Sequence, residues 1–290
     1  MSETQWAKIA PLLPGKTSVL GRTGSDSGKM GVVMSRLKIG VVLSRLVLIG
    51  AIGAIGWAAV VTVLAADGPV SANVSAAVAD STRPTGDVKT DLNRKPAETL
   101  AFAGVKPGMS VGEFFPGGGY FTRMLSGVVG VSGHVYALEN VDWTGRLKAV
   151  IAEGRLTNVS EEALPFGTVS FPKPLDLVWL TQNYHDLKIA QYGQVDTAAF
   201  NREVFASLKP GGTYFVLDHE APVGTDLPTI ARLHRIEKAQ VIREVTAAGF
   251  ELIAEGNFLR RPDDDHTLPV KDEKVRGQTD QYALRFVKPR

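Results

Sequence analysis

Acidic residues and glycines near the middle of the 290-residue chain have the types and spacing of a ligand-binding turn. Glu113 precedes a run of three glycines, Gly117, Gly118 and Gly119, and a second acid, Glu139, follows at a spacing of 139 − 119 = 20 residues. Glycine has no side chain to keep a ligand from the main chain, and a helix start offers backbone N–H groups without partners. The segment therefore predicts a strand, a turn and a helix that together bind a nucleotide-like ligand.

The spacing differs from that of a dinucleotide-binding turn. The G-x-G-x-x-G pattern requires a glycine three positions after Gly119, where this chain has Thr122. Glu113 would also repel a phosphate group placed against the turn, whereas it would favour a cationic ligand. S-adenosylmethionine has a sulfonium and an amino group and no phosphate, so an acid beside bare backbone suits it. The alternative is a structural turn in which Glu113 only faces a helix dipole.

The region around these residues resembles motif I of the class I S-adenosylmethionine-dependent methyltransferases, in which glycines follow an acid. In that family an acid at the end of the second strand contacts the ribose hydroxyls, a role that the resemblance gives to Glu139. The chain is also similar to a subgroup of bacterial predicted methyltransferases. The resemblance covers roughly Asp91 to Pro289, and its matching segments are 95–108, 116–120, 183–186, 208–212 and 218–219.

The resemblance implies S-adenosylmethionine as the cofactor, bound by Glu113, Gly117, Gly118, Gly119 and Glu139, and methyl transfer to a small-molecule acceptor. It also implies an α/β fold: a Rossmann-like, seven-stranded, mostly parallel sheet with helices on both faces and a C-terminal antiparallel hairpin. The alternation of apolar strand and helix patterns is typical of such a sheet. Residues 95–290 are therefore predicted to be the methyltransferase domain.

Periodicity and turn residues give the expected elements of this domain. Strands are expected at 111–115, 134–138, 156–159, 175–181, 213–217, 250–254 and 281–287. Helices are expected at 97–103, 120–125, 144–152, 200–208 and 230–248. The third strand has the weakest pattern, because Glu161 and Glu162 interrupt its apolar run.

Polar residues of catalytic types follow the expected strand at 175–181. Asn183, Tyr184, His185 and Asp186 lie beyond its carboxyl end, where open α/β sheets bind ligands. Asn183, His185 and Asp186 are the candidate catalytic residues, with His185 as a base toward a protonated acceptor, because imidazole titrates near neutrality. Tyr184 is a candidate substrate-binding residue. The alternatives are that His185 only caps the strand and that Tyr184 packs in the core.

A second polar pair, Asp218 and His219, ends the expected strand at 213–217. Parallel strands place their carboxyl ends at one edge of a sheet, so this pair is expected beside the first polar group. Asp218 and His219 are predicted to contact the substrate. Alternatively, they are strand-end residues that bond to the backbone.

Two other classes of function remain open. A metal-assisted hydrolase could use His185, Asp186, Asp218, His219 and His266, since histidines and carboxylates are suitable ligands. No pair of these residues has tight metal spacing such as H-x-x-x-H, and no metal ligand is predicted. The third hypothesis is a non-catalytic nucleoside-binding module on the same fold.

An uncharged apolar run at 46–66 is long enough to cross a hydrocarbon core as a helix. Arg36, Lys38 and Arg45 precede it, which predicts a cytoplasmic N-terminus and a domain on the far side of the membrane. Residues 34–66 are therefore predicted to be a cleaved signal peptide or a membrane anchor, and the domain to be extracytoplasmic. S-adenosylmethionine is made inside cells, and this conflict motivates the non-catalytic hypothesis.

The chain before residue 34 has a different character. Residues 5–14 and 21–24 resemble the N-terminus of insertion-sequence transposases. Residues 1–33 are therefore interpreted as an extraneous or disordered leader, with a native start at Met30 or Met34. Residues 67–94 are rich in Ala, Ser, Val, Asp and Thr and are predicted to be a linker.

The charge and composition of the chain disfavour some classes of partner and ligand. The formal net charge is +2; the first 79 residues hold seven Lys and Arg against three acids, which leaves 25 against 27 for the remainder. A slightly acidic domain disfavours a nucleic-acid partner bound through its phosphates. The absence of cysteine excludes disulfides and thiolate metal ligands. The oligomeric state is left open by the sequence.

Overall fold

The computed structural model of the chain describes residues 70–143, 145–193 and 195–290. The leader predicted at 1–33 and the signal peptide or anchor predicted at 34–66 lie outside these residues. Within the described ranges, no helix is both long enough and apolar enough to cross a membrane.

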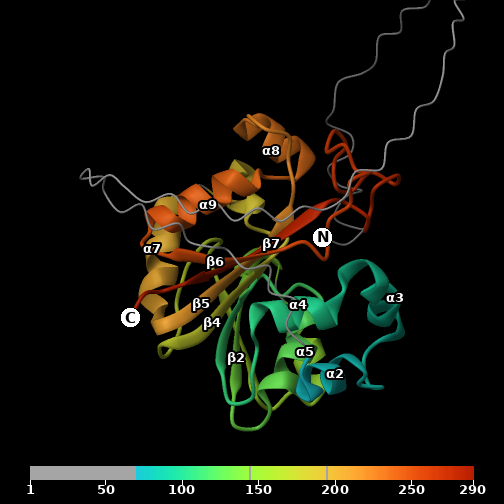
Figure 1. Cartoon of the computed structure of the whole chain (residues 1–290). Coiled ribbons are helices and arrows are strands. Elements are labelled where there is room, and N and C mark those ends of the chain that lie inside the picture. The colour runs from blue at the N-terminus through green and yellow to red at the C-terminus, as the bar shows by residue number, and fades with distance from the viewer. Residues whose placement is uncertain (1–69, 144, 194) are drawn as a thin grey trace, which may run out of the picture. The chain divides into compact units, whose positions relative to one another are not determined.

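Three helices precede the first strand of the described chain, and strands then largely alternate with helices (Figure 1). The strands are β1 (Ser110–Phe114), β2 (His134–Asn140), β3 (Val159–Leu164), β4 (Leu175–Thr181), β5 (Leu208–His219), β6 (Glu251–Gly256) and β7 (Gln281–Val287). The helices are α2 (Ala72–Val78), α3 (Thr85–Arg94), α4 (Pro96–Ala103), α5 (Tyr120–Val129), α6 (Arg146–Glu153), α7 (Thr197–Ser207), α8 (Leu227–Leu233) and α9 (Lys238–Ala247). The predicted bounds of β4 and β7 are confirmed.

The strands form one seven-stranded sheet in the order β3-β2-β1-β4-β5-β7-β6. The pairs that join β1 through β5 are parallel, whereas β7 runs antiparallel to both β5 and β6. This confirms the predicted mostly parallel sheet with a C-terminal antiparallel hairpin. The chain builds outward from β1 in one direction and from β4 in the other, so the switch point of the topology lies between these two strands.

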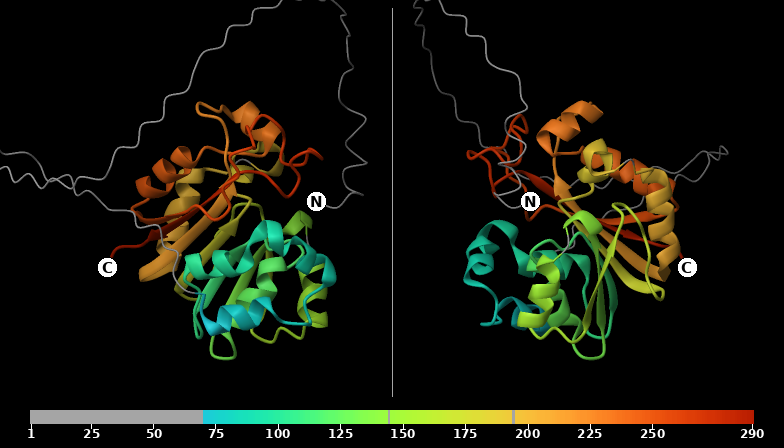
Figure 2. Two further views of the ribbon diagram at one scale, coloured as in Figure 1. Left: turned by 45° about the vertical axis from the view of Figure 1, so that its right-hand side comes forward. Right: turned by 180° about the vertical axis from the view of Figure 1, so that it is seen from behind.

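Alternating strand residues bury apolar side chains on both faces of the sheet. On one face, Trp179 and Phe215 contact each other, and Trp179 also contacts Phe121 of α5. On the opposite face, Phe114 contacts Phe200 of α7. Figures 1 and 2 show α2, α4 and α5 on the first side of the sheet and α7 and α9 on the other. These two buried layers hold the strand ends in fixed positions.

The segment expected to be a linker is folded over its described part. Residues 70–94 contain α2 and α3, and α2 buries Val74 and Ala77 against α5. A Cβ on Gly127 of α5 would lie 3.1 Å from the Cβ of Ala77, so small side chains allow these helices to pack closely. The Ala- and Ser-rich composition that indicated a linker is thus also the composition of a tight helix contact.

The third strand begins later than predicted, at Val159 and not at Leu156. It pairs only with β2 and forms an edge of the sheet, which explains why it tolerates Glu161 and Glu162. The helix expected at 230–248 is also divided, into α8 and α9. Its break is at His234, whose φ of 54° is left-handed and ends α8.

Candidate functional site

The residues chosen from the sequence lie at the carboxyl ends of parallel strands, as expected. Because β1, β2, β4 and β5 are parallel and adjacent, their carboxyl ends meet at one edge of the sheet. Glu113 lies in β1, just before its end, and Glu139 lies near the end of β2. The polar group 183–186 follows β4, and Asp218 and His219 end β5.

The three glycines of the turn between β1 and α5 have different roles. Gly117 and Gly119 have left-handed backbones, with φ of 57° and 74°, a conformation that favours glycine. A Cβ on Gly119 would lie 2.7 Å from Cγ1 of Val150, so this glycine allows α6 to pack against the turn. A Cβ on Gly117 or Gly118 would meet no atom within 4 Å. The main chain at 117–118 is therefore bare and borders space that a ligand could fill.

Glu113 is a buried carboxylate with little compensation. Its side chain is 2 % exposed, and its Oε2 accepts a hydrogen bond from Oγ1 of Thr122 at 2.7 Å. Burial raises the pKa of Glu113 to about 8, and the charge of Glu139 adds to this increase. The bond from Thr122 and the charge of Arg94 act in the opposite direction but do not cancel the effect of burial.

Glu139 is the second buried carboxylate at this end of the sheet, and it is 3 % exposed. Burial raises its pKa to about 7, although the backbone N–H groups of Asn140 and Gly117 bond to its carboxylate and lower the pKa. Glu139 therefore links the glycine turn to the end of β2. Among the described residues, neither Glu113 nor Glu139 forms an ion pair.

Residues beside the glycine turn that the sequence did not single out come from α3 and the start of α5. The guanidinium of Arg94 lies 4.1 Å from the ring centroid of Tyr120 and donates a hydrogen bond to Oε1 of Gln182 at 3.2 Å. The hydroxyl of Tyr120 donates to Asp91 at 2.6 Å. This arrangement binds α3 to the turn and to the end of β4. No sequence motif marks it, because it depends on packing of a segment expected to be a linker.

His185 lies between two carboxylates. Its Nδ1 is 2.8 Å from Oδ1 of Asp218, and its Nε2 is 3.3 Å from Oδ1 of Asp186. Burial alone would lower the pKa of His185, but Asp218 and Asp186 outweigh burial and raise that pKa to about 10. A histidine with this pKa keeps its proton at neutral pH, which argues against the base role suggested by its residue type. Its part in catalysis stays a prediction.

Asn183 and Tyr184, which precede His185 in the predicted group, have different surroundings. Tyr184 is fully buried; its hydroxyl donates to Glu244 at 2.9 Å and accepts from Asn201 at 2.8 Å. Its side chain packs with the core on the α7 and α9 side, in line with the alternative that it is a packing residue. Asn183 instead donates to Oδ2 of Asp186 at 2.7 Å and fixes that carboxylate.

Asp218 and His219 are buried and bonded within the protein. Asp218 accepts hydrogen bonds from the backbone N–H groups of His185 and His219 at 2.9 and 2.7 Å, in addition to its contact with the His185 ring. His219 Nδ1 lies 2.7 Å from Oγ1 of Thr279, and burial lowers the pKa of His219 to about 3. Asp218 thus positions His185 and has little capacity left for a substrate, which supports the alternative of a strand-end residue bonded to backbone.

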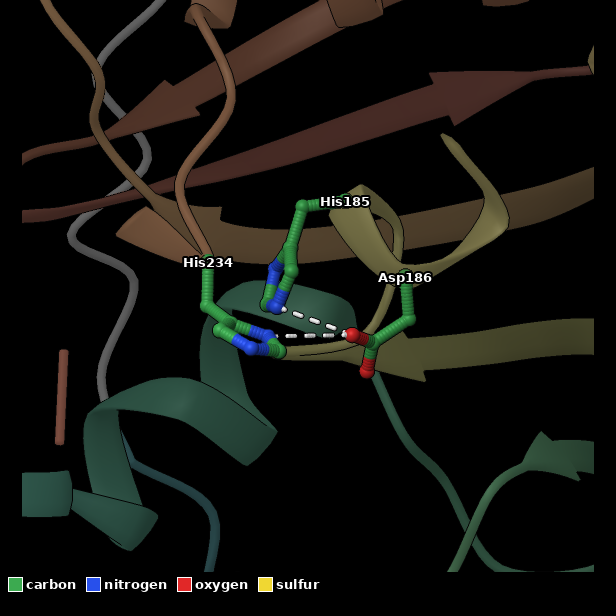
Figure 3. A group of neighbouring side chains, drawn as sticks. All are labelled: His185, Asp186 and His234. Atoms are coloured by element: carbon green, nitrogen blue, oxygen red, sulfur yellow. Dashed lines mark ion pairs between the residues drawn. The ribbon is translucent and has the colours of Figure 1, made fainter. Parts of the chain in front are cut away.

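A residue that the sequence did not select, His234, completes this cluster (Figure 3). Its Nδ1 lies 3.3 Å from Oδ1 of Asp186, the same oxygen that faces His185. His234 is remote in sequence from the other two, so no local spacing could identify it. The five residues considered for a hydrolase do not assemble, because His266 bonds Asp280 at 3.0 Å and lies apart from this cluster.

Comparisons with known proteins place the fold. No protein-family model and no curated protein sequence matches the chain. It is similar to the crystal structure of a SAM-dependent methyltransferase from Aquifex aeolicus, with a TM-score of 0.51 and 17% identity over 72% of this chain and 100% of that one. It is also similar to a protein from Galdieria sulphuraria described as a sarcosine dimethylglycine methyltransferase, with a TM-score of 0.50 and 17% identity over 68% and 84% of the two chains. The chain therefore has the Rossmann-like fold of these methyltransferases.

Proposed function

We propose that the protein transfers the methyl group of S-adenosylmethionine to a small-molecule acceptor. The observation that carries this proposal is the pairing of bare backbone at Gly117 and Gly118 with two buried carboxylates, Glu113 and Glu139. Buried carboxylates without a cation are costly, and the raised pKa values of both acids express that cost. A ligand that brings positive charge to the glycine turn would lower it.

The cofactor suits this chemistry, and open space lies beside Gly117 and Gly118. S-adenosylmethionine, when bound, supplies a methyl group on a cationic sulfur, which is a good leaving group. The glycine turn would hold it by the main chain, and Glu113 and Glu139 would compensate its charge or bond its hydroxyls. The remaining task of the protein is to align the acceptor with the methyl group and to exclude water.

The acceptor is expected at the end of β4. This strand is the neighbour of β1 in the sheet, so the residues after it lie at the switch point beside the glycine turn. The polar side chains there, Asn183, His185 and Asp186, are those best placed to orient an acceptor. The small excess of acids over bases in the domain favours a small molecule and not a nucleic acid.

Binding of the cofactor can be tested at Gly118. A Gly118→Leu variant should fold, since neither left-handed backbone nor a neighbouring atom opposes a side chain there. Calorimetry should show at least about a hundredfold lower affinity for S-adenosylmethionine and for its demethylated product, because the leucine fills the space of the ligand. Gly86→Leu is the matched control, since Gly86 has the same freedom in α3. Equal affinity of both variants and wild type would refute the site.

A further inference from the structure

Three buried side chains direct ligand atoms at a common point beyond β4. Nε2 of His185 and Nδ1 of His234 each lie 3.3 Å from Oδ1 of Asp186, and all three atoms lie within 4.8 Å of one another. Figure 3 shows the His185 ring and the Asp186 carboxylate, from adjacent residues after β4, facing the His234 ring at the end of α8. Among the residues that the structure describes, no other His, Cys, Asp and Glu group meets this condition.

Asp186 is in ion-pair contact with both imidazoles, but neither contact has hydrogen-bond geometry. Oδ1 of Asp186 is buried and has no hydrogen-bond partner of suitable geometry, although two ring nitrogens lie near it. A buried carboxylate oxygen without a hydrogen bond requires an explanation, and a bound ion is one that is known. Metal bonds of about 2.1 Å place neighbouring ligand atoms roughly 3.0–3.4 Å apart in octahedral or tetrahedral geometry. The observed spacing of 3.3 Å to the shared oxygen lies in that range.

The surroundings orient each ligand atom. His185 Nδ1 faces Oδ1 of Asp218, which leaves Nε2 directed at the cluster, and metal-bound histidines commonly have such a carboxylate partner. Asp218 is in turn fixed by two backbone N–H groups. Asn183 donates to Oδ2 of Asp186 and directs Oδ1 inward.

The backbone of His234 is also fixed by its surroundings. Its backbone N–H closes α8 by bonding to Ile230, and its left-handed φ of 54° is unusual for a side chain with a Cβ. The next residue, Arg235, is fully buried and forms two hydrogen bonds with Asp264. The chain thus retains a strained conformation at the point where it presents an imidazole to Asp186.

We propose that His185, Asp186 and His234 bind a divalent transition-metal ion, which displaces the proton of His185 Nε2. Two histidines and one carboxylate suit Zn²⁺, Fe²⁺ or Mn²⁺ and leave coordination positions open. The further step rests on the proposed methyltransferase function: an open position takes a hydroxyl oxygen of the acceptor. The hydroxyl proton leaves to solvent, the oxygen lone pair forms the O–CH₃ bond, and the S–CH₃ electron pair returns to sulfur.

The metal site is tested on the full-length protein by Co²⁺ titration, read by visible absorption, together with elemental analysis after purification without chelator. One equivalent of bound metal per chain is expected. His234→Gly removes one ligand and suits the left-handed backbone, so it should fold. Its Co²⁺ affinity should fall by more than the roughly 10–100-fold that loss of a supporting residue costs. His134→Ala, at the start of β2, is the matched histidine control and should bind as wild type.

The two proposals fail in different ways. Calorimetry with S-adenosylmethionine on chelator-treated wild type and on His234→Gly should show unchanged affinity, because the glycine turn does not use these residues. Absence of stoichiometric Co²⁺ binding, or equal Co²⁺ affinity in His234→Gly and wild type, would overturn the metal site and leave the cofactor proposal intact. Stoichiometric metal without any S-adenosylmethionine binding would retain the site and remove its role toward a methyl acceptor.

Discussion

The carboxyl edge of the sheet holds two pairs of buried carboxylates, and their surroundings affect the two pairs differently. Glu113 and Glu139, at the ends of β1 and β2, have raised pKa values of about 8 and about 7. Asp186 and Asp218, beyond β4 and at the end of β5, enclose His185. Burial alone would raise the pKa of Asp186, but the neighbouring imidazoles hold it well below its usual range.

Burial does not explain this difference, because Glu113, Glu139, Asp186 and Asp218 are 2 %, 3 %, 6 % and 0 % exposed. What differs is the presence of a cation. The aspartates have an imidazole within contact distance, whereas the glutamates have only hydrogen-bond donors and the more distant charge of Arg94. The aspartate pair is thus compensated within the protein, whereas we expect the glutamate pair to be compensated by a ligand that brings positive charge.

Removal of an aspartate should therefore have the largest effect on stability. Asp218→Asn breaks a buried charge pair and places an amide against the backbone N–H groups of His185 and His219. We expect the free energy of unfolding to fall by about 3–5 kcal/mol, measured by urea denaturation at pH 7. Glu255→Gln is the control, since its pair with Lys238 is about one-third exposed and is expected to contribute less than about 1 kcal/mol. Equal losses of unfolding free energy in the two variants would contradict the stabilising role of the aspartate pair.

The glutamate pair should instead make the ligand-free protein less stable as pH rises. Unfolded glutamates lose their protons near pH 4.5, whereas folded Glu113 and Glu139 keep theirs until about pH 8 and about pH 7. The folded state binds more protons in this window, so the free energy of unfolding falls between pH 4.5 and 8, by on the order of 5 kcal/mol from Glu113 alone. Urea denaturation of wild type and Glu113→Gln across this range isolates the effect. A fall of the same size in both would contradict it.

For ligand affinity, unlike stability, the glutamate pair should matter more than the aspartate pair. Glu113→Gln keeps an acceptor for Thr122 but removes the charge, so affinity for S-adenosylmethionine should fall at least about tenfold, or about 1.4 kcal/mol. The ligand-free variant should be no less stable than wild type above pH 7. Calorimetry gives the affinity, and Glu255→Gln again serves as the control for loss of an acid. Unchanged affinity would mean that Glu113 does not face the ligand's positive charge.

The sequence predicted the glutamate pair and the sheet that positions it, because both depend on local patterns. Glu113 and the glycines are contiguous, and apolar runs mark β4 and β7 with their observed bounds. The acid at the end of β2 follows at a spacing set by one strand–helix–strand unit. These features can be predicted without knowledge of the tertiary packing, since each is determined within a few tens of residues.

The aspartate pair was predicted only in part, because its geometry depends on chain direction at single residues. Gln182 has a left-handed φ of 60°, which directs Tyr184 to the core and His185 to Asp218. The alternation of apolar and polar residues along a strand does not predict a left-handed turn at a non-glycine residue. His234 has a similar conformation at the end of α8, within a stretch expected to be a continuous helix. Both deviations determine which side chains meet, and neither has a sequence signal.

The smallest effect is expected at Thr122, the residue that stands where a dinucleotide-binding turn would have glycine. Thr122→Val keeps the shape of the side chain but removes the hydrogen bond to Glu113. The loss of stability should be about 2 kcal/mol at pH 9, where Glu113 is ionised, and about 1 kcal/mol at pH 5, since bonds to charged groups are the stronger ones. Thr99→Val is the matched control, because this buried hydroxyl bonds only backbone carbonyls and its loss should not depend on pH.

The same variant separates charge from geometry at the glutamate pair. Thr122→Val leaves the charge of Glu113 available to a cation, so affinity for S-adenosylmethionine should fall by less than in Glu113→Gln. A loss as large as that of Glu113→Gln would show that the orientation of the carboxylate, and not its charge, determines binding. In that case the glutamate pair would be as prearranged as the aspartate pair, and the contrast between the two ends of the edge would have to be abandoned.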